Sequence, residues 1–354
     1  MRAVRMSRWE MGSPSRSQVV FRSAERELML GEVFEDEKDV FVLGAGFSRA
    51  ISPSMPLLSD LAQALMEPAE FLSFGGSLEQ WLSFLAEDHP WLTSAENARQ
   101  HATFLQQSSK LAAQVRVAQA SAVAEGLPTW LAQLIDLWHR GRSTVLSFNY
   151  DMLVERAWTK VLGSGADGAP TAVYPIPPAP LLRRRGSAGV ERPRPDTFRL
   201  LKLHGSLNWL YSGLAGTPSE TVYDASSGAG WGAGPEDEEE HLDLLAPDKV
   251  PFIVPPTQGK TAFFDHELIR AQWQMAREAV ATAERIFFLG HSLPDSGGML
   301  RSLLRAAARG KVLVPIDTSE TVVERYRSLR SHDVVDEYVR DAEPIPSFVR
   351  YCAG

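Results

Sequence analysis

The sequence predicts an α/β protein: a Rossmann-like parallel sheet with helices on both faces, an inserted helical subdomain and no zinc module. Short apolar runs alternate along the chain with stretches that repeat apolar residues at helical spacing. The single cysteine, Cys352, cannot supply the paired cysteines of a structural zinc site. Five apolar runs are expected to form the parallel strands, at residues 39–43, 143–148, 197–203, 285–289 and 311–316.

The first strand runs directly into a glycine-rich turn. This turn consists of Gly44, Ala45, Gly46, Phe47 and Ser48. Glycine lets the backbone turn sharply and approach a phosphate, and the N–H groups of such a turn can hold phosphate oxygens. Ordinary tight turns carry the same pattern, so this stretch alone leaves both interpretations open. Residues 50–56 contain two prolines and are expected to form a loop beside the turn.

Residues 57–140 are expected to form a helical block inserted between the first and second strands. Apolar residues recur there at helical spacing. Ser77, followed three residues later by Gln80, is typical of a capping box at a helix start. Aromatic residues at this spacing are interpreted as core packing. The helices are predicted over residues 57–66, 78–85, 95–125 and 128–140.

The rest of the chain divides into flanking segments, further helices and two long loops. Residues 1–38 are expected to be an N-terminal extension, residues 39–330 the Rossmann-like domain and residues 331–354 a C-terminal tail. The long loops cover residues 163–195, with a basic run at 183–185, and residues 212–247, with an acidic run at 236–240. Both charge runs are interpreted as solvated surface. Later helices are expected to start near residues 152, 268, 298 and 318.

Composition excludes several classes of protein. A net charge of −8 is unfavourable for holding nucleic acid over the whole surface, so no direct nucleic-acid partner is expected. No apolar run is long enough to span a membrane, and no membrane partner is expected. The arginines near the N-terminus are not followed by an apolar run, which argues against a secretory signal. A cytoplasmic location is therefore expected.

Polar or glycine-rich residues follow four of the predicted strands. In a parallel sheet such strand ends lie along one edge, where ligands bind. Core packing alone does not require four such ends, so their agreement favours a binding site. Asn149 or Asp151 could instead cap the following helix. The four segments are residues 44–48, 149–151, 204–206 and 290–295, and Asp317 follows the fifth strand.

The ordered set of motifs resembles the sirtuin-like (SIR2) family, and specifically its bacterial branch that lacks the zinc module. The family's Gly-Ala-Gly-x-Ser turn corresponds to residues 44–48, and its Asn-x-Asp element to Asn149, Tyr150 and Asp151. Its His-Gly element corresponds to His204 and Gly205, and its Gly-x-Ser-Leu turn to residues 290–293. Each motif is short, but their order and approximate spacing match from residue 39 to about residue 317.

Two departures separate the chain from deacylating sirtuins. Those enzymes carry paired zinc-binding cysteines and a Pro-Asp-Phe-Arg segment after the glycine turn. Here residues 54–58 read Ser-Met-Pro-Leu-Leu, without the acid or the arginine. The zinc-less relatives are known chiefly as enzymes that hydrolyse NAD to nicotinamide and ADP-ribose, often as effectors of anti-phage defence. The resemblance therefore implies an NAD hydrolase with NAD as substrate and no metal.

The resemblance also implies roles for individual residues. Gly44, Ala45, Gly46 and Ser48 are expected to hold the pyrophosphate. Asn149 would orient the ribose and the attacking water, and Asp151 would contact the nicotinamide carboxamide. His204 would take or share a proton, since imidazole titrates near neutral pH; from the residues alone it is as often structural as catalytic. Gly290 and Ser292 would contact phosphate or the adenosine ribose, and Asp317 the adenosine ribose hydroxyls.

Two other functions stay open at this point. One is transfer of an acyl group or ADP-ribose to or from a protein, and the other is a non-catalytic sensor of NAD or ADP-ribose. An unrestrained NAD hydrolase would kill its own cell, so regulation is expected through a homo-oligomer or through a regulatory partner protein. Zinc-less relatives often act with a helicase-type ATPase or an Argonaute-like protein, and nothing in these residues identifies one.

Overall fold

The computed structural model describes residues 39–162, 170–181, 196–213, 220–225, 248–257, 261–294, 298–329 and 342–353. The expectations for residues 1–38, 183–185 and 236–240, and for Asp295, lie outside the described residues. No helix in these ranges has both the length and the apolar character needed to cross a membrane.

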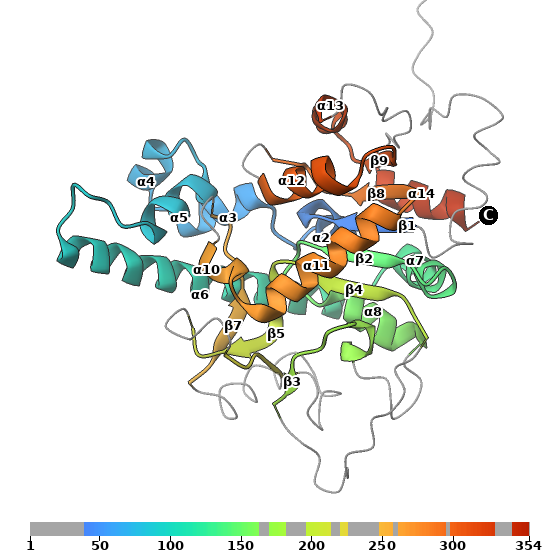
Figure 1. The fold of residues 1–354 in the computed structure, drawn as a ribbon, viewed down its shortest axis with the longest axis horizontal. Coiled ribbons are helices and arrows are strands. Elements are labelled where there is room, and N and C mark those ends of the chain that lie inside the picture. Colours follow the sequence, from blue (N-terminus) through green and yellow to red (C-terminus); the bar gives the residue numbers. More distant parts are fainter. Residues whose placement is uncertain are drawn as a thin grey trace, which may run out of the picture.

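A five-stranded parallel sheet forms the centre of the fold, as the sequence predicts (Figure 1). The first strand lies in the middle of the sheet; the following strands are added outward on one side of it, and the last two are added on its other side. This is the doubly wound arrangement of a Rossmann-like fold, and the reversal lies between β1 and β8. In spatial order the strands are β4 (Arg199–Lys202), β2 (Thr144–Ser147), β1 (Asp39–Leu43), β8 (Arg285–Leu289) and β9 (Val312–Ile316).

Helices cover both faces of this sheet. Successive side chains of β1 point to opposite faces, so Phe41 and Leu43 belong to one apolar cluster while Val40 and Val42 belong to the other. On the first face Phe41 stacks on Phe287 with ring centroids 4.9 Å apart. That face is covered by α2 (Ala45–Ile51), α7 (Thr129–Arg140), α8 (Leu153–Leu162) and α14 (Pro344–Cys352), and the other by α11 (Glu267–Thr282), α12 (Gly298–Ala307) and α13 (Glu320–Ser328).

The inserted helices group on one side of the molecule (Figure 1). The expected helices are found, and Ser77 Oγ accepts the N–H of Gln80 at the start of α5 as predicted. The last helix of the expected block, α7, packs on the sheet instead, since Trp138 contacts Phe41 at 5.5 Å between ring centroids. The other inserted helices are α3 (Leu58–Leu65), α4 (Pro68–Ser73), α5 (Leu78–Ala86) and α6 (Ser94–Glu125).

Three local features differ from expectation. Ala50 and Ile51 belong to α2 rather than to a loop, because Pro53 excludes the helical conformation only at Ser52, which is extended. The range 331–354, expected as a tail, contains α14, whose Phe348 packs on Phe287 at 5.4 Å between ring centroids.

Short apolar segments around the predicted loops pair into a second sheet. Its strands are β3 (Ala179–Pro180), β6 (Tyr223–Asp224), β5 (Gly205–Tyr211) and β7 (Val250–Ile253), and two short helical turns, η1 (Pro170–Val173) and α10 (Thr261–Phe264), lie nearby in sequence.

Candidate functional site

The carboxyl ends of the five parallel strands bring the predicted site segments to one edge of the sheet. The glycine turn after β1 lies between the end of β2, with Asn149, and the end of β8, with Gly290. His204 follows β4 at one side of the sheet, and Asp317 follows β9 at the other. The reversal point between β1 and β8 is where open α/β sheets bind ligands. The edge is therefore the candidate active site.

The Asn149 side chain is held by two hydrogen bonds from its amide nitrogen. Nδ2 donates to the main-chain oxygen of Gly44 at 2.9 Å and to Oγ of Ser48 at 2.9 Å. An amide group has two N–H donors, and both are used here. The carbonyl oxygen Oδ1 is thus the part of this half-buried side chain that remains to accept a hydrogen bond from a substrate hydroxyl or a water.

Ser48 connects Asn149 to Asp151. Its hydroxyl donates to Oδ2 of Asp151 at 2.6 Å, so it must accept, not donate, in its contact with Asn149. We call this chain of hydrogen bonds the Asn149–Ser48–Asp151 relay. Ser48 is only 3% exposed, and its hydroxyl is occupied inside the protein rather than turned to a ligand. In the structure the hydroxyl orients Asn149, and its expected contact with pyrophosphate stays a prediction.

Asp151 also begins the helix that follows. It is buried, and its Oδ1 accepts the N–H of Leu153 in the first turn of α8 at 3.1 Å. Both carboxylate oxygens thus have partners within the protein. The sequence left open whether Asp151 caps the helix or belongs to the site. In the structure Oδ1 of Asp151 caps α8, while Oδ2 accepts from Ser48 and so helps to orient Asn149. Its contact with nicotinamide stays a prediction.

The glycines after β1 and β8 pack directly against each other. A Cβ on Gly44 would lie 2.6 Å from the Gly290 oxygen, and a Cβ on Gly46 would lie 2.8 Å from it. Gly290 has φ of +58°, and a Cβ there would come within 2.4 Å of Gly46. The N–H groups of Gly44 and Gly46 donate to the main-chain oxygens of Leu289 and Gly290. The close approach of the two turns thus requires these glycines. The sequence led us to expect that the N–H groups of Gly44 and Gly46 hold phosphate, but in the structure they donate to main-chain oxygens and are not available to it.

His204 lies at the point where the chain leaves the first sheet and enters the second. It is half-buried, between β4 and β5, and its main-chain oxygen accepts the N–H of Val254 at 2.8 Å. Its ring meets that of Phe148 edge-on, with centroids 4.9 Å apart. Gly205 has φ of +75°, and a Cβ there would lie 2.1 Å from the Phe252 oxygen. The turn therefore requires glycine directly after His204, which accounts for the His-Gly pair.

His291, which is buried, also meets the ring of Phe148, with centroids 5.0 Å apart. Its Nδ1 accepts the N–H of Leu293 at 3.1 Å, so that nitrogen carries no proton. Burial lowers the pKa of His291 to about 4. His291 is therefore neutral at physiological pH. The next residue, Ser292, is exposed, and its main-chain oxygen accepts a hydrogen bond from Arg325 at 3.0 Å.

Asp317 occupies the opposite end of the edge from His204. Its Oδ1 accepts the N–H of Ser319 at 2.9 Å within its own turn. Burial raises the pKa of Asp317, and the main-chain N–H groups of Ser319 and Thr318 and the nearby Arg325 oppose that shift. The side chain is half-buried. Its contact with the adenosine ribose stays a prediction.

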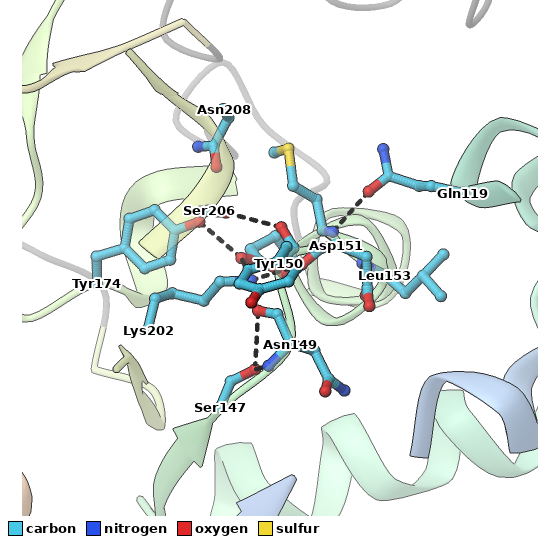
Figure 2. A network of polar contacts seen from close by, with 12 residues as sticks. Gln119, Ser147, Asn149, Tyr150, Asp151, Leu153, Tyr174, Lys202, Ser206 and Asn208 are labelled. Atoms are coloured by element: carbon cyan, nitrogen blue, oxygen red, sulfur yellow. Dashed lines mark hydrogen bonds and ion pairs between the residues drawn. The ribbon is translucent and has the colours of Figure 1, made fainter. Parts of the chain in front are cut away.

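Several residues next to the site are absent from the sequence-based prediction. Lys202 is 1% exposed and donates both to the main-chain oxygen of Asp151 and to Glu155, which is itself fully buried. Tyr174 donates to the same Glu155 oxygen at 2.6 Å. Gln119 of α6 accepts the N–H of Met152 at 2.7 Å (Figure 2). A lysine inside the apolar run Leu-Leu-Lys-Leu was a visible signal, whereas Gln119 had none.

Among the described residues, no group of three or more His, Cys, Asp or Glu side chains is arranged to hold a metal ion.

Comparison with known proteins gives distant likenesses only. No protein-family model matches the chain, and no curated protein matches it. A solved structure of a Sir2 homologue variant in complex with 2'-O-acetyl ADP-ribose is similar with a TM-score of 0.46 and 16% identity, over 92% of this chain and 96% of that one. Two Sir2 homologue variants in complex with ADP-ribose have TM-scores of 0.44 and 0.43 and identities of 15% and 14%, with the same coverage. At this distance the chain's own contacts, rather than these likenesses, must support a function.

Proposed function

We propose that this chain binds NAD along the carboxyl edge of its parallel sheet and hydrolyses the bond between nicotinamide and ribose, releasing nicotinamide and ADP-ribose. The observation that carries the proposal is the Asn149–Ser48–Asp151 relay, because it uses both N–H donors of Asn149 and leaves Oδ1 as an oriented acceptor at the site. An acceptor in that place can hold a ribose hydroxyl or position a water. The resemblance of the motifs to the SIR2 family supports the choice of NAD.

The proposed ligand lies across the whole edge. Four spacings between neighbouring strands separate β4 from β9, or about 19 Å, a span that suits a dinucleotide better than a mononucleotide. The nicotinamide ribose lies by Asn149 and His204, and the adenosine ribose lies toward Asp317 and Ser292. The pyrophosphate passes the exposed Ala45, between the turns that carry Gly44 and Gly290.

The proposed reaction needs little covalent help from the protein. As the C–N bond breaks, its electron pair goes to the nicotinamide ring nitrogen, which loses its positive charge, and C1′ of the ribose becomes oxocarbenium-like. A water held by Asn149 Oδ1 attacks C1′ and gives up a proton to His204 or to solvent. Positioning of the water and the ribose is the main contribution of the chain.

The test is incubation of the purified protein with NAD and chromatographic measurement of nicotinamide and ADP-ribose. We expect both products in equal amounts, with rates lower by about a hundredfold or more in Asn149→Ala and His204→Ala. Binding of NAD without turnover would support a sensor instead. Product formation that requires an added acyl-lysine peptide would support a deacylase. If His204→Ala turns over NAD as fast as the parent, the assigned role of His204 is wrong.

We also propose that the hydrolase is a regulated effector of bacterial anti-phage defence that acts by depleting NAD. Its activity would be controlled by assembly into a homo-oligomer or by a partner such as a helicase-type ATPase or an Argonaute-like protein. Mass measurement in solution, made alongside the activity assay, tests this. A monomer that is fully active without any partner or stimulus would contradict the proposal.

A further inference from the structure

One peptide group beside the site is held at both of its polar ends. The main-chain oxygen of Asp151 accepts from the ammonium of Lys202, and the N–H of Met152, in the same peptide group, donates to Oε1 of Gln119 at 2.7 Å. In Figure 2, Gln119 reaches this segment from one side and Lys202 from the other. We call the two side chains and this peptide the peptide clamp.

The two holding residues come from different parts of the fold. Gln119 belongs to α6, the long helix of the inserted block, and is 5% exposed. Lys202 ends β4, and its ammonium lies 3.2 Å from the carboxylate of Glu155, inside the protein. A buried ammonium is unfavourable unless its donors are satisfied and its charge is paired. Glu155 supplies the charge and Asp151 supplies a further acceptor, which fixes the lysine on this peptide.

The clamp acts on the same residue that orients Asn149. The side chain of Asp151 accepts from Ser48, and Ser48 accepts from Asn149. A rotation or shift of the Asp151–Met152 peptide would move the Asp151 carboxylate, and the amide of Asn149 would lose its fixed direction. Displacements of this kind, well under the size of a side chain, cost large factors in rate when they misplace a reacting group.

We propose that Gln119 and Lys202 are positioning residues that hold Asn149 in its working orientation through the Asp151–Met152 peptide. Through Gln119, the inserted helical block becomes part of the machinery of the site and not only a cover beside it. The catalytic consequence rests on the proposed function, whereas the mechanical link does not.

Gln119 permits a closely matched test. Gln119→Glu keeps the length of the side chain and an acceptor oxygen, whether the new carboxyl is ionised or protonated. Gln119→Met keeps the length and the bulk but offers Met152 no comparable acceptor. For Gln119→Met we expect kcat for NAD hydrolysis to fall by about tenfold or more with KM changed by less than about threefold. Gln119→Glu should retain most of kcat.

Lys202 is tested in a neutral background, because removal of its charge alone would leave Glu155 unpaired. The double variants K202Q/E155Q and K202M/E155Q have the same charge and differ mainly in the N–H donor that Gln offers to the Asp151 oxygen. Gln is one bond shorter than Lys, so partial retention of kcat is expected in the first. A larger fall in kcat is expected in the second.

Amide hydrogen exchange gives a readout that does not depend on catalysis. The N–H of Leu153 is bonded to the Asp151 side chain and not to Gln119. If the clamp positions Asp151, this amide will exchange faster in Gln119→Met than in Gln119→Glu, with equal exchange elsewhere in α8. Equal kcat and equal Leu153 exchange in the two Gln119 variants would overturn the proposal. The proposal would also be overturned if kcat fell equally in both Gln119 variants and in proportion to a fall in Tm, since the effect of Gln119 would then come from packing alone. If the parent protein does not hydrolyse NAD, the proposed function fails, and Leu153 exchange still decides the clamp.

Discussion

The hydroxyl of Ser48 donates a 2.6 Å hydrogen bond to the carboxylate of Asp151, although the two residues are 103 positions apart in the chain. Ser48 lies on α2, directly after the first strand, and Asp151 begins α8, directly after the second. The bond joins two neighbouring strand ends, and it decides which atom of Asn149 faces the site. The behaviour of this pair under mutation is therefore the most direct measure of how the site is organised.

Ser48→Ala should lower kcat for NAD hydrolysis by about tenfold or more, because Asn149 loses one of its two acceptors and its amide is held less firmly. Stability should fall by about 1–3 kcal/mol, since a buried carboxylate oxygen loses its donor. Steady-state kinetics and chemical denaturation measure the two effects. Ser109→Ala, on the exposed side of α6, is the matched control and should change neither quantity. Full activity in Ser48→Ala would show that the relay is not needed.

Asn149→Asp keeps the shape of the side chain but removes both N–H donors. The new carboxylate would face the main-chain oxygen of Gly44 and would lie close to Asp151, so like charges would be brought together. We expect kcat to fall by about a hundredfold or more at neutral pH. Part of the activity should return as the pH is lowered and the new carboxyl protonates, which a pH–rate profile of the variant would detect. A variant as active as the parent at pH 7 would contradict the role given to the amide.

Gly290→Ala should be far more destabilising than the matched change Gly310→Ala. Both glycines have positive φ, of +58° and +75°, but a Cβ on Gly310 meets no atom within 4 Å, whereas one on Gly290 lies 2.4 Å from Gly46. Gly310→Ala carries only the backbone cost, about 1–2 kcal/mol. For Gly290→Ala the steric clash adds to it, for a total of about 3 kcal/mol or more. Denaturation curves of the two variants test the difference, and similar losses would mean that the turns can separate freely.

His291 should make the fold less stable in mild acid. Burial lowers its pKa in the folded protein to about 4, below the ordinary histidine value of 6.5. Above pH 6.5 the residue is neutral in both folded and unfolded chains and contributes no pH dependence. Between pH 6.5 and about 4 the unfolded chain takes up the proton first, so the free energy of unfolding falls as the pH falls, by up to about 3 kcal/mol.

The variant His291→Asn removes this titration and can still accept the N–H of Leu293. Its free energy of unfolding should depend less on pH than that of the parent across the same interval. His101→Asn, at an exposed position of α6, is the control for loss of a histidine in general. Parallel pH curves for the parent and His291→Asn would exclude this contribution.

Lys202→Met should destabilise the protein strongly, by about 3–5 kcal/mol, because it leaves the fully buried Glu155 without its counter-charge. The double variant K202M/E155L should recover much of that loss, since a buried ion pair replaced by apolar groups of similar size is often tolerated. Thermal and chemical denaturation of the single and double variants measure the free energies of unfolding that a double-mutant cycle compares. If the second substitution adds to the loss, the two residues do not act as a pair.

The sequence was sufficient to predict the parallel sheet and most of its helices, because each strand and helix has its own apolar pattern. Residues 40–43 are all apolar because β1 is covered on both faces, and alternate residues of β1 enter the two clusters. The second sheet as a whole escaped prediction, because β3 and β6 contain two residues each: β3 forms only by pairing with β6, and β6 by pairing with β5. Helix α14 is absent from the prediction for another reason: it has only nine residues and begins Pro-Ile-Pro, and prolines usually indicate a break rather than a helix.

Strand ends could be placed on one edge of the sheet from the sequence alone, because parallel strands must present their carboxyl ends together. The sequence therefore predicts that Gly44, Asn149, His204 and Gly290 lie along one edge of the sheet. Which atoms they use was decided only by the tertiary structure. Gly44 and Gly46 are required by the approach of Gly290, and their N–H groups bond to main chain from a segment more than 240 residues away in the sequence.

Ser48 and Lys202 show the same division. Their residue types and their positions at strand ends are local properties that the sequence carries by itself. Asp151 is a partner of both residues, Asn149 is a further partner of Ser48, and Glu155 is a further partner of Lys202. These contacts depend on how β1, β2 and β4 pair and on how α8 packs against them. Hydrogen bonds are directional and reach only about 3 Å. The direction of the Asn149 amide is therefore settled by packing between distant segments and by no local pattern in the sequence.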